Sequence, residues 1–227
     1  KQISGQPLAI EVIPCSVDLD LFNPATINIS LKNQLQQELG ISNGEMIFSY
    51  LGSIGGWYLT REMMQYCKLL EEAFPAARFL FISPHRHEQI AEAAAAAGIP
   101  AEKLITKQAR RDEVPALLSF STYSIFFIKP CYSKISSSPT KHGEIMAMGI
   151  PVITNAGVGD VKEIVEHYHS GIVLDDLSET SMQKAVASIK NGVTFQPDAI
   201  RKGATEVYSL TNAVQLYLRL YNKILQP

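Results

Sequence analysis

Ser136-Ser-Ser-Pro-Thr-Lys-His-Gly-Glu144 is the stretch on which the fold of this 227-residue chain depends. One apolar run, Ile125-Phe-Phe-Ile128, precedes it, and another, Pro151-Val-Ile-Thr154, follows it. We expect Ser138 to be the N-cap of a helix between the two runs, because Pro139 can occupy the first helical position without losing a hydrogen bond. A strand, a helix and a strand at this spacing predict a βαβ unit of a parallel sheet.

The expected start of this helix carries residue types that suit a phosphate group. Small and hydroxylated residues leave backbone N–H groups accessible there, and the positive end of the helix dipole attracts an anion. Lys141 adds a full positive charge, and Glu144, three residues on, lies on the same face. A carboxylate in that place can accept hydrogen bonds from a sugar diol. An ordinary capped helix with an ion pair between Lys141 and Glu144 explains the same residues, so spacing alone leaves both interpretations open.

Four further apolar runs, each followed by a stretch with helical spacing, have the length and composition of buried strands: 46–51, 77–82, 103–107 and 171–174. The alternation of strands and helices predicts an α/β fold. We expect a Rossmann-like, doubly wound sheet of about six parallel strands, with helices on both faces. The first run leads into Gly52-Ser-Ile-Gly-Gly56. Such a turn can bring the backbone against a phosphate or a reacting group, although Gly-rich turns are also common without function.

The composition narrows the classes of protein to which the chain can belong. Hydrophobic residues make up 46% and charged residues 19% of the chain, which indicates a soluble globular protein with a substantial core. A net charge of -2 offers no electrostatic footprint for a nucleic acid. Three cysteines without a spaced pair argue against a disulfide framework or a zinc site. The apolar runs are too short to span a bilayer, which takes roughly 18 residues.

Several chemistry-bearing residues outside this unit have plain structural explanations. The pair in His85-Arg-His87 invites a metal, but no third ligand candidate stands nearby, so we expect a solvated loop. Arg110 and Arg111 are expected to be surface charges, and Trp57 to pack in the core. We expect a solvated or capping role for His142, because no nucleophile stands at a recognisable spacing from it.

Two segments resemble parts of a known enzyme family. Ser138-Pro-Thr-Lys-x-x-Glu-x-Met-Ala-x-Gly-x-Pro-Val-Ile153 is similar to the donor-binding segment of GT-B glycosyltransferases, in particular the large retaining family (group 1, family 4 type) that uses nucleotide-diphospho-sugars. Val12-Ile-Pro-Cys-Ser-Val-Asp-Leu-Asp-Leu-Phe22 resembles the segment where those enzymes cross from the N-terminal to the C-terminal domain, with Ser16 in place of the usual Gly. The resemblance runs from Ile10 to Leu225 and implies the C-terminal, donor-binding half of a GT-B fold.

The resemblance also implies roles for particular residues. In the family the helix start holds the donor diphosphate, and the Glu that matches Glu144 binds the nucleotide ribose. In the family a Gly-rich loop closes over the diphosphate and often carries an Arg and a Lys. In this chain neither residue type follows Gly52 until Arg61. Many members carry a second Glu on the donor sugar, where this chain has Ser136. The loop after the 103–107 strand holds the base through backbone groups. The expected nucleotide-sugar-binding residues are therefore Gly52, Ser53, Gln108, Ser136, Ser137, Ser138, Thr140, Lys141 and Glu144, whereas the catalytic residues stay unknown.

The implied reaction moves a sugar from a nucleotide-diphospho-sugar to a hydroxyl acceptor with retention at the anomeric carbon, in polysaccharide, lipopolysaccharide or glycoconjugate synthesis. The helix N-terminus and Lys141 can stabilise the departing diphosphate, so we expect no metal and no other cofactor. Two alternatives stay open. One is a nucleotide-sugar epimerase of related architecture, and the other is a non-catalytic Rossmann-like nucleotide-binding module, which Ser136 favours a little.

The expected organisation has three parts. Residues 1–24 form an interdomain crossing segment, residues 25–209 form the nucleotide-sugar-binding domain, and residues 210–227 form a helix that crosses back toward an N-terminal domain. The first residue is Lys, so we expect a fragment or a processed product that is inactive alone. The expected partners are the nucleotide-sugar donor, a hydroxyl acceptor such as a saccharide or a lipid-linked glycan, and the missing N-terminal domain. The expected location is the cytoplasm, with any peripheral membrane contact made through that domain.

Overall fold

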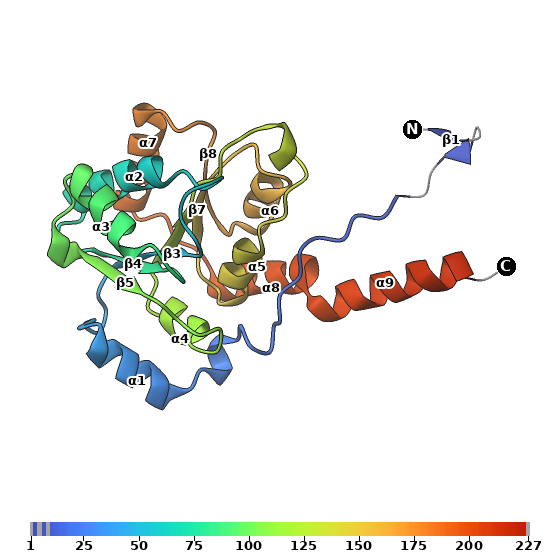
Figure 1. Cartoon of the computed structure of the whole chain (residues 1–227), viewed down its shortest axis with the longest axis horizontal. Helices are drawn as coiled ribbons and strands as arrows, with labels where there is room; N and C mark the ends of the chain where they lie inside the picture. The colour runs from blue at the N-terminus through green and yellow to red at the C-terminus, as the bar shows by residue number, and fades with distance from the viewer. Residues whose placement is uncertain (1, 4–5, 8–9, 226–227) are drawn as a thin grey trace.

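Six parallel strands form the centre of the computed structural model, which describes residues 2–3, 6–7 and 10–225. They pair in the order β5-β4-β3-β6-β7-β8 (Figure 1). Their bounds are β3 (Ile47–Leu51), β4 (Arg78–Ile82), β5 (Leu104–Lys107), β6 (Tyr123–Phe126), β7 (Val152–Asn155) and β8 (Gly171–Leu174). A short antiparallel pair, β1 (Gln2–Ile3) and β2 (Gln6–Pro7), precedes them. The predicted Rossmann-like, doubly wound α/β fold is confirmed.

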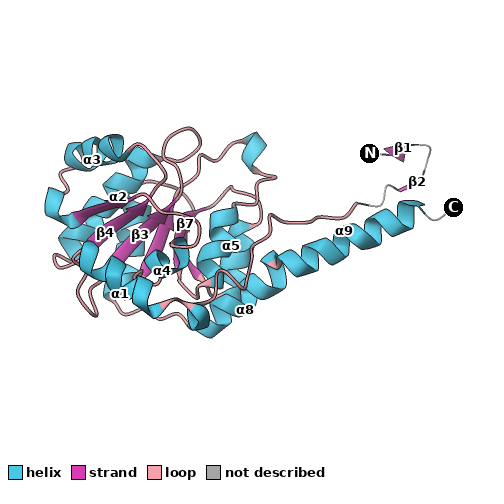
Figure 2. Ribbon diagram, turned by 60° about the horizontal axis from the view of Figure 1, so that its bottom comes forward, coloured by secondary structure: helices cyan, strands magenta, loops and turns pink. Residues whose placement is uncertain are grey.

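Helices cover both faces of this sheet (Figure 2). For that reason β3, β6 and β7 are buried along their whole length and read in the sequence as continuous apolar runs. The helices are α1 (Ile29–Glu38), α2 (Thr60–Ala73), α3 (His87–Ala96), α4 (Val114–Leu118), α5 (Thr140–Ala147), α6 (Val161–Tyr168), α7 (Glu179–Lys190), α8 (Pro197–Tyr208) and α9 (Leu210–Leu225).

The N-terminus of α5 differs from the expectation in one respect. The helix begins at Thr140, with Pro139 as an extended N-cap residue (ψ 114°) and no side-chain cap among the described residues. Ser138 is therefore one position too early to cap it. Its Oγ instead accepts a hydrogen bond from the backbone N–H of Cys15, 3.1 Å away. The expected capping serine thus ties the N-terminal segment to the helix start.

Helix α5 lies against the place where the N-terminal segment meets α8. The backbone N–H of Val17 donates to the carbonyl of Tyr208 at 2.7 Å, and the N–H of Leu210 donates to the carbonyl of Val17 at 3.2 Å. Gly143 makes this close approach possible. A Cβ on Gly143 would lie 2.7 Å from Val17 Cγ2 and 2.8 Å from Tyr208 Cγ.

We expect Gly143→Ala to lower the free energy of unfolding by up to about 2 kcal/mol. Overpacking costs about 1–3 kcal/mol, and the better helix propensity of Ala offsets about 1 kcal/mol of it. Urea unfolding measures the change. The Val17→Ala background removes one of the two clashing groups, so the cost of Gly143→Ala should shrink there. A stabilised Gly143→Ala protein would show that the contact is looser than the structure indicates.

Helix α9 leaves the body of the molecule (Figure 1). Four apolar residues at helical spacing lie along it and are 46–76% exposed: Val214, Tyr217, Tyr221 and Leu225. Spacing predicts which face of the helix is apolar, but it does not predict what covers that face. The domain bounds assigned from the sequence stay a prediction. Within the described part of the chain, no helix combines the length and the apolar character needed to cross a membrane.

Candidate functional site

The switch point of the sheet lies between β3 and β6. From this pair the strand order runs through β4 to β5 on one side and through β7 to β8 on the other. Ligands of open α/β sheets bind at such a switch point. The loop after β3, which begins at Gly52, and the loop after β6 meet there. Lys129 N–H donates to the carbonyl of Trp57 at 2.8 Å, and Leu59 N–H donates to the carbonyl of Phe127 at 3.0 Å.

Lys141 lies beneath the loop after β3, enclosed by two tyrosines. Its Nζ donates to the Tyr50 hydroxyl at 3.1 Å and lies 3.7 Å from the centre of the Tyr58 ring. The residue is only 7% exposed. Burial disfavours the charged form and lowers the pKa of Lys141 to about 7, although the nearby Glu144 opposes this shift. At neutral pH both the charged and the neutral form of the Lys141 side chain are therefore populated.

The Gly-rich loop touches the lysine directly. A Cβ on Gly52 would lie 2.9 Å from Lys141 Nζ, and Gly52 has φ +115°, so only glycine fits here without strain. The Tyr50 hydroxyl, which receives the lysine hydrogen bond, donates its own proton to the carbonyl of Ser53. Burial raises the pKa of Tyr50 and so keeps this hydroxyl protonated. The structure thus brings together Gly52, Ser53 and Lys141, three residues that the resemblance implies belong to one site.

Glu144, one turn along α5, has a different partner from the one that spacing suggests. Its side chain is 9% exposed, and Oε1 accepts a hydrogen bond from Arg111 Nη1 at 2.9 Å. Among the described residues, Lys141 and Glu144 do not form an ion pair. Arg111 is 61% exposed, as expected for a surface charge, but it also has a partner that the sequence did not indicate, the nearly buried Glu144. Its neighbour Arg110 is 70% exposed and pairs with Asp112 and Glu113.

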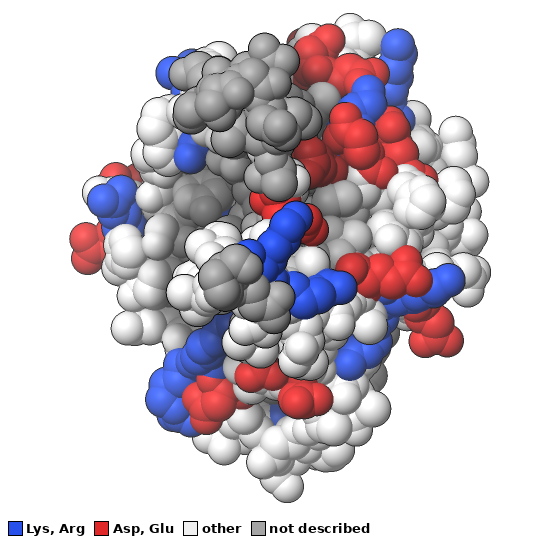
Figure 3. All heavy atoms as spheres, turned by 90° about the vertical axis from the view of Figure 1, so that its right-hand side faces the viewer, with Lys and Arg blue, Asp and Glu red and all other residues white. Residues whose placement is uncertain are grey.

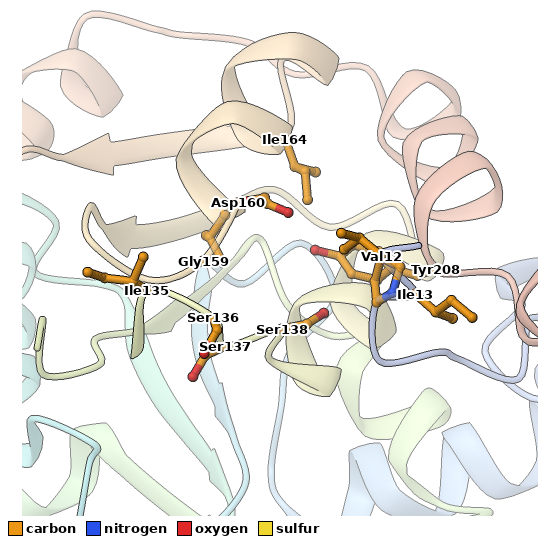
Figure 4. A pocket seen from close by; sticks show the side chains of 12 residues that line it. Val12, Ile13, Ile135, Ser136, Ser137, Ser138, Gly159, Asp160, Ile164 and Tyr208 are labelled. Carbon is orange, nitrogen blue, oxygen red and sulfur yellow. The ribbon is translucent and has the colours of Figure 1, made fainter. Parts of the chain in front are cut away.

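The serines that precede α5 line a separate pocket of about 300 Å³, in which neither Lys141 nor Glu144 takes part. Figure 4 shows Ser138 turned toward the segment that holds Val12 and Ile13, and the start of α6 on the opposite side. Gly159 packs against the serine loop so closely that a Cβ on it would lie 1.8 Å from the carbonyl oxygen of Ser137. The pocket is lined by Val12, Ile13, Pro14, Ile135, Ser136, Ser137, Ser138, Gly159, Asp160, Val161, Ile164 and Tyr208.

The other predicted residues lie at the edge of the site. Thr140 is exposed at the first position of α5, and Gln108 is exposed just after β5, at the carboxyl edge of the sheet. Trp57, expected in the core, is 50% exposed and lies under Lys134 Nζ, 4.5 Å from its ring centre. This loop position leaves the indole outside the layer between sheet and helices.

His142 is the second buried titratable residue of α5, and the expected solvated or capping role is wrong. It is fully buried, its Nδ1 lies 3.0 Å from the Tyr208 hydroxyl, and its Nε2 has no hydrogen-bond partner in the described structure. Burial lowers the pKa of His142 to about 3, so the ring is neutral at physiological pH. Every residue of α5 after Thr140 is buried, so a polar residue there has to face protein.

Metal-binding groups do not gather in the described part of the chain, where no three His, Cys, Asp or Glu side chains come together. His87 opens α3, and its Nε2 lies 2.9 Å from the carbonyl of Ser83. Basic and acidic side chains are interspersed on the face in Figure 3. The described residues on that face form no extended basic surface of the kind that binds nucleic acids.

Comparison with known proteins gives a family and a fold. Residues 32–205 match the sequence model of the family described as "Glycosyl transferases group 1". The structure is similar to a glycosyltransferase from Rickettsia africae (TM-score 0.70, 17% identity, 95% of this chain and 57% of that one). It is equally similar to HepE from Anabaena, solved in complex with UDP-glucose (TM-score 0.70, 14% identity, 92% and 56%). No curated protein matches the chain.

A third solved structure is that of a single domain. It is the C-terminal domain of LpcC, a glycosyl transferase group 1 family protein from Francisella tularensis (TM-score 0.58, 17% identity). The match covers 88% of this chain and 97% of that domain. The chain therefore spans little more than half of the two longer proteins and corresponds in extent to the single domain.

Proposed function

The chain belongs to the glycosyl transferases group 1 family, and on that premise we propose that it binds a nucleotide-diphospho-sugar donor and takes part in transfer of the sugar to a hydroxyl acceptor. The observation that carries the proposal is the convergence of Gly52, Lys141 and the N-terminus of α5 at the switch point of the sheet. Backbone N–H groups, a helix dipole and an ammonium are what a diphosphate requires. The UDP-glucose bound to HepE is a ligand of this chemical class.

Each group has a defined part in the proposed reaction. The N-terminus of α5 and protonated Lys141 hold the diphosphate, and they stabilise the negative charge that develops on it as the bond to the sugar breaks. Glu144 accepts hydrogen bonds from the two ribose hydroxyls. The positive charge comes from the protein itself, so the proposal includes no metal. Retention at the anomeric carbon and a role in polysaccharide, lipopolysaccharide or glycoconjugate synthesis belong to the same proposal.

The acceptor side is proposed to come from a second domain. The chain covers 57% of the Rickettsia protein and 56% of HepE. We propose that residues 1–24 lead in from that domain and that α9 returns to it. The apolar side chains exposed on α9, among them Tyr217 and Leu218, at 49% each, are consistent with such a contact. The site would then lie in the cleft between the two domains.

A second candidate function is nucleotide binding without turnover. Ser136 stands where many members of the resembling family have a Glu on the donor sugar, so the site has one acidic group fewer. Net sugar transfer by the full-length protein would exclude this candidate. Titration of UDP, GDP and ADP, free and as sugar conjugates, tests the shared premise, because all three failing to bind would refute both functions.

Glu144→Ala should weaken nucleotide binding by about 1.5–3 kcal/mol, because charge-assisted hydrogen bonds to the ribose are lost. Calorimetry with the tightest-binding diphosphate measures the change. The matched control is Glu45→Ala. Glu45 is also nearly buried (12% exposed) and pairs with an arginine, Arg78, but it lies just before β3, at the amino edge of the sheet. Equal losses in the two variants would contradict the assignment of Glu144 to the ribose.

A further inference from the structure

The ion pair between Arg111 and Glu144 joins two segments that lie far apart in the sheet. Arg111 stands in the loop after the edge strand β5, and Glu144 stands on α5, after β6. Their side chains meet at 2.9 Å between Nη1 and Oε1. A third segment supports the contact, because the guanidinium carbon of Arg111 lies 5.2 Å from the centre of the ring of Phe22, which is fully buried.

The two partners differ in exposure. The Glu144 side chain is 9% exposed, whereas the Arg111 side chain is 61% exposed. The pair therefore lies at the rim of the site, with the carboxylate inside and the guanidinium reaching to it from solvent. Because solvent reaches the Arg111 side of the pair and screens it, the pair adds less to stability than a fully enclosed pair would, so stability alone gives a weak reason for an arginine at this position.

Orientation of the Glu144 carboxylate is a stronger reason for an arginine at position 111. A carboxylate has about four lone-pair sites, and the bond from Arg111 uses one of them on Oε1. The remaining sites can accept two hydroxyl groups of a diol. The aromatic ring of Phe22 holds the planar guanidinium by a cation–π contact, so the donor that fixes Glu144 is itself fixed.

We propose that Arg111 is a positioning residue: it holds the Glu144 carboxylate in the orientation that accepts both ribose hydroxyls, and it thereby sets the preference of the site for ribonucleotides over 2′-deoxyribonucleotides. This inference rests on the proposed function, because it assumes that a nucleotide occupies the site. Arg111 acts through Glu144 and need not touch the nucleotide.

The test compares Arg111→Met with Arg111→Lys and with the control Arg110→Met. Arg110 is the neighbouring residue, is similarly exposed and is also ion-paired, but to Asp112 and Glu113. Calorimetry gives the Kd of each protein for UDP, GDP and ADP, and then for the 2′-deoxy form of the tightest of them. Thermal unfolding checks that each variant is folded.

Arg111→Met is expected to weaken the ribonucleotide about tenfold, in line with the loss of a charge-assisted bond to its carboxylate, and to leave the 2′-deoxy form within about twofold. The preference for ribose should therefore largely disappear. Arg111→Lys should restore part of it, because Lys supplies the charge without the fixed fork. Arg110→Met should keep the wild-type preference. In a Glu144→Gln background, Arg111→Met should have no further effect on the preference.

Three outcomes would overturn the inference. Equal weakening of both nucleotides would make Arg111 a general electrostatic contributor. An unchanged preference would make the pair incidental, and tighter ribonucleotide binding by Arg111→Met would show that Arg111 competes with the ribose for Glu144. These outcomes leave the proposed function standing, because the wild-type chain still binds. If the wild-type chain binds none of the three diphosphates, the proposed function fails and the inference falls with it.

Discussion

Lys141→Met is expected to remove the preference of the site for a nucleoside diphosphate over the bare nucleoside, and at the same time to stabilise the folded protein. Losing the partner of a largely desolvated charge costs about 2–5 kcal/mol of binding. The nucleoside has no phosphate and should bind almost as before. If Lys141 served only to orient Glu144, both ligands would weaken equally, because the ribose contact would be lost in either case.

The gain in stability follows from the buried ammonium. Burial lowers the pKa of Lys141 in the folded state from 10.5 to about 7. Between these values the unfolded chain binds the extra proton, so the stability of the wild-type protein rises as the pH rises from 7 to 10.5. Met keeps the aliphatic stem against Tyr50 and Tyr58 and removes the charge. The lowered pKa corresponds to about 4–5 kcal/mol, and the loss of the contacts from the ammonium to Tyr50 and Tyr58 offsets part of it. We therefore expect a net gain of about 1–3 kcal/mol at pH 7, which disappears as the pH approaches 10.5.

The same pKa makes diphosphate binding depend on pH. The ligand needs the charged lysine, so the affinity of the wild-type protein should fall from pH 7 to pH 9, by up to about tenfold per unit. In Lys141→Met this dependence should be absent. Lys68→Met is the control, because Lys68 is 33% exposed and its hydrogen bond to Glu71 raises its pKa. A pH-independent affinity of the wild-type protein would show that Lys141 does not contact the diphosphate.

The sheet could be predicted from the sequence because each strand is marked by a short run of apolar residues that are adjacent in the chain. The runs that contain β3, β6 and β7 are apolar on both faces, and each is separated from the next by a helical stretch. Helix starts were less certain. At the start of α1 the N-cap is Asn28, whose Oδ1 accepts a hydrogen bond from Leu31 N–H, and Ser30, a residue type that also caps helices, lies inside the helix. Two polar residues close to a helix start are both good caps, and only the backbone conformation decides between them.

The site could be predicted only where its residues are close in sequence or carry a motif. Gly52 and Lys141 stood out because a Gly-rich turn and a charged helix start are visible in the chain. The pairing of Arg111 with Glu144 was not visible, because it depends on which strands are neighbours. One signal was present in part: Arg111 follows a predicted strand, and the carboxyl ends of parallel strands lie at one edge of the sheet. His142 gave no signal, because its burial comes from the packing of α5 against α8.

Acidification should destabilise the protein through His142. The pKa of the buried ring is about 3, against 6.5 for an accessible histidine. As the pH falls from 6.5 toward 3, the unfolded chain takes up a proton that the folded chain excludes. The stability is therefore fully present above pH 6.5 and is lost progressively below it. The shift corresponds to about 4–5 kcal/mol in total, of which about 2–3 kcal/mol is lost by pH 4.5.

His142→Leu isolates this contribution. The variant leaves the Tyr208 hydroxyl without its partner and should lose about 1 kcal/mol at pH 7, yet its stability should fall less than that of the wild-type protein between pH 7 and pH 4.5. The control is His167→Leu at an exposed position of α6, where the pH dependence of the wild-type protein should persist. Urea unfolding at several pH values measures all three proteins.

Lys141 contributes little to the pH dependence of stability in this range, because well below pH 7 it is protonated in both the folded and the unfolded chain. Tyr208 links His142 to the N-terminal segment. Its hydroxyl contacts His142, and its carbonyl accepts the hydrogen bond from Val17 N–H. A charged His142 would therefore disturb both the helix that starts at the proposed diphosphate site and the segment proposed to enter from a second domain. If wild-type protein and His142→Leu lose the same free energy between pH 7 and pH 4.5, the acid sensitivity arises from other groups and the buried imidazole is not its cause.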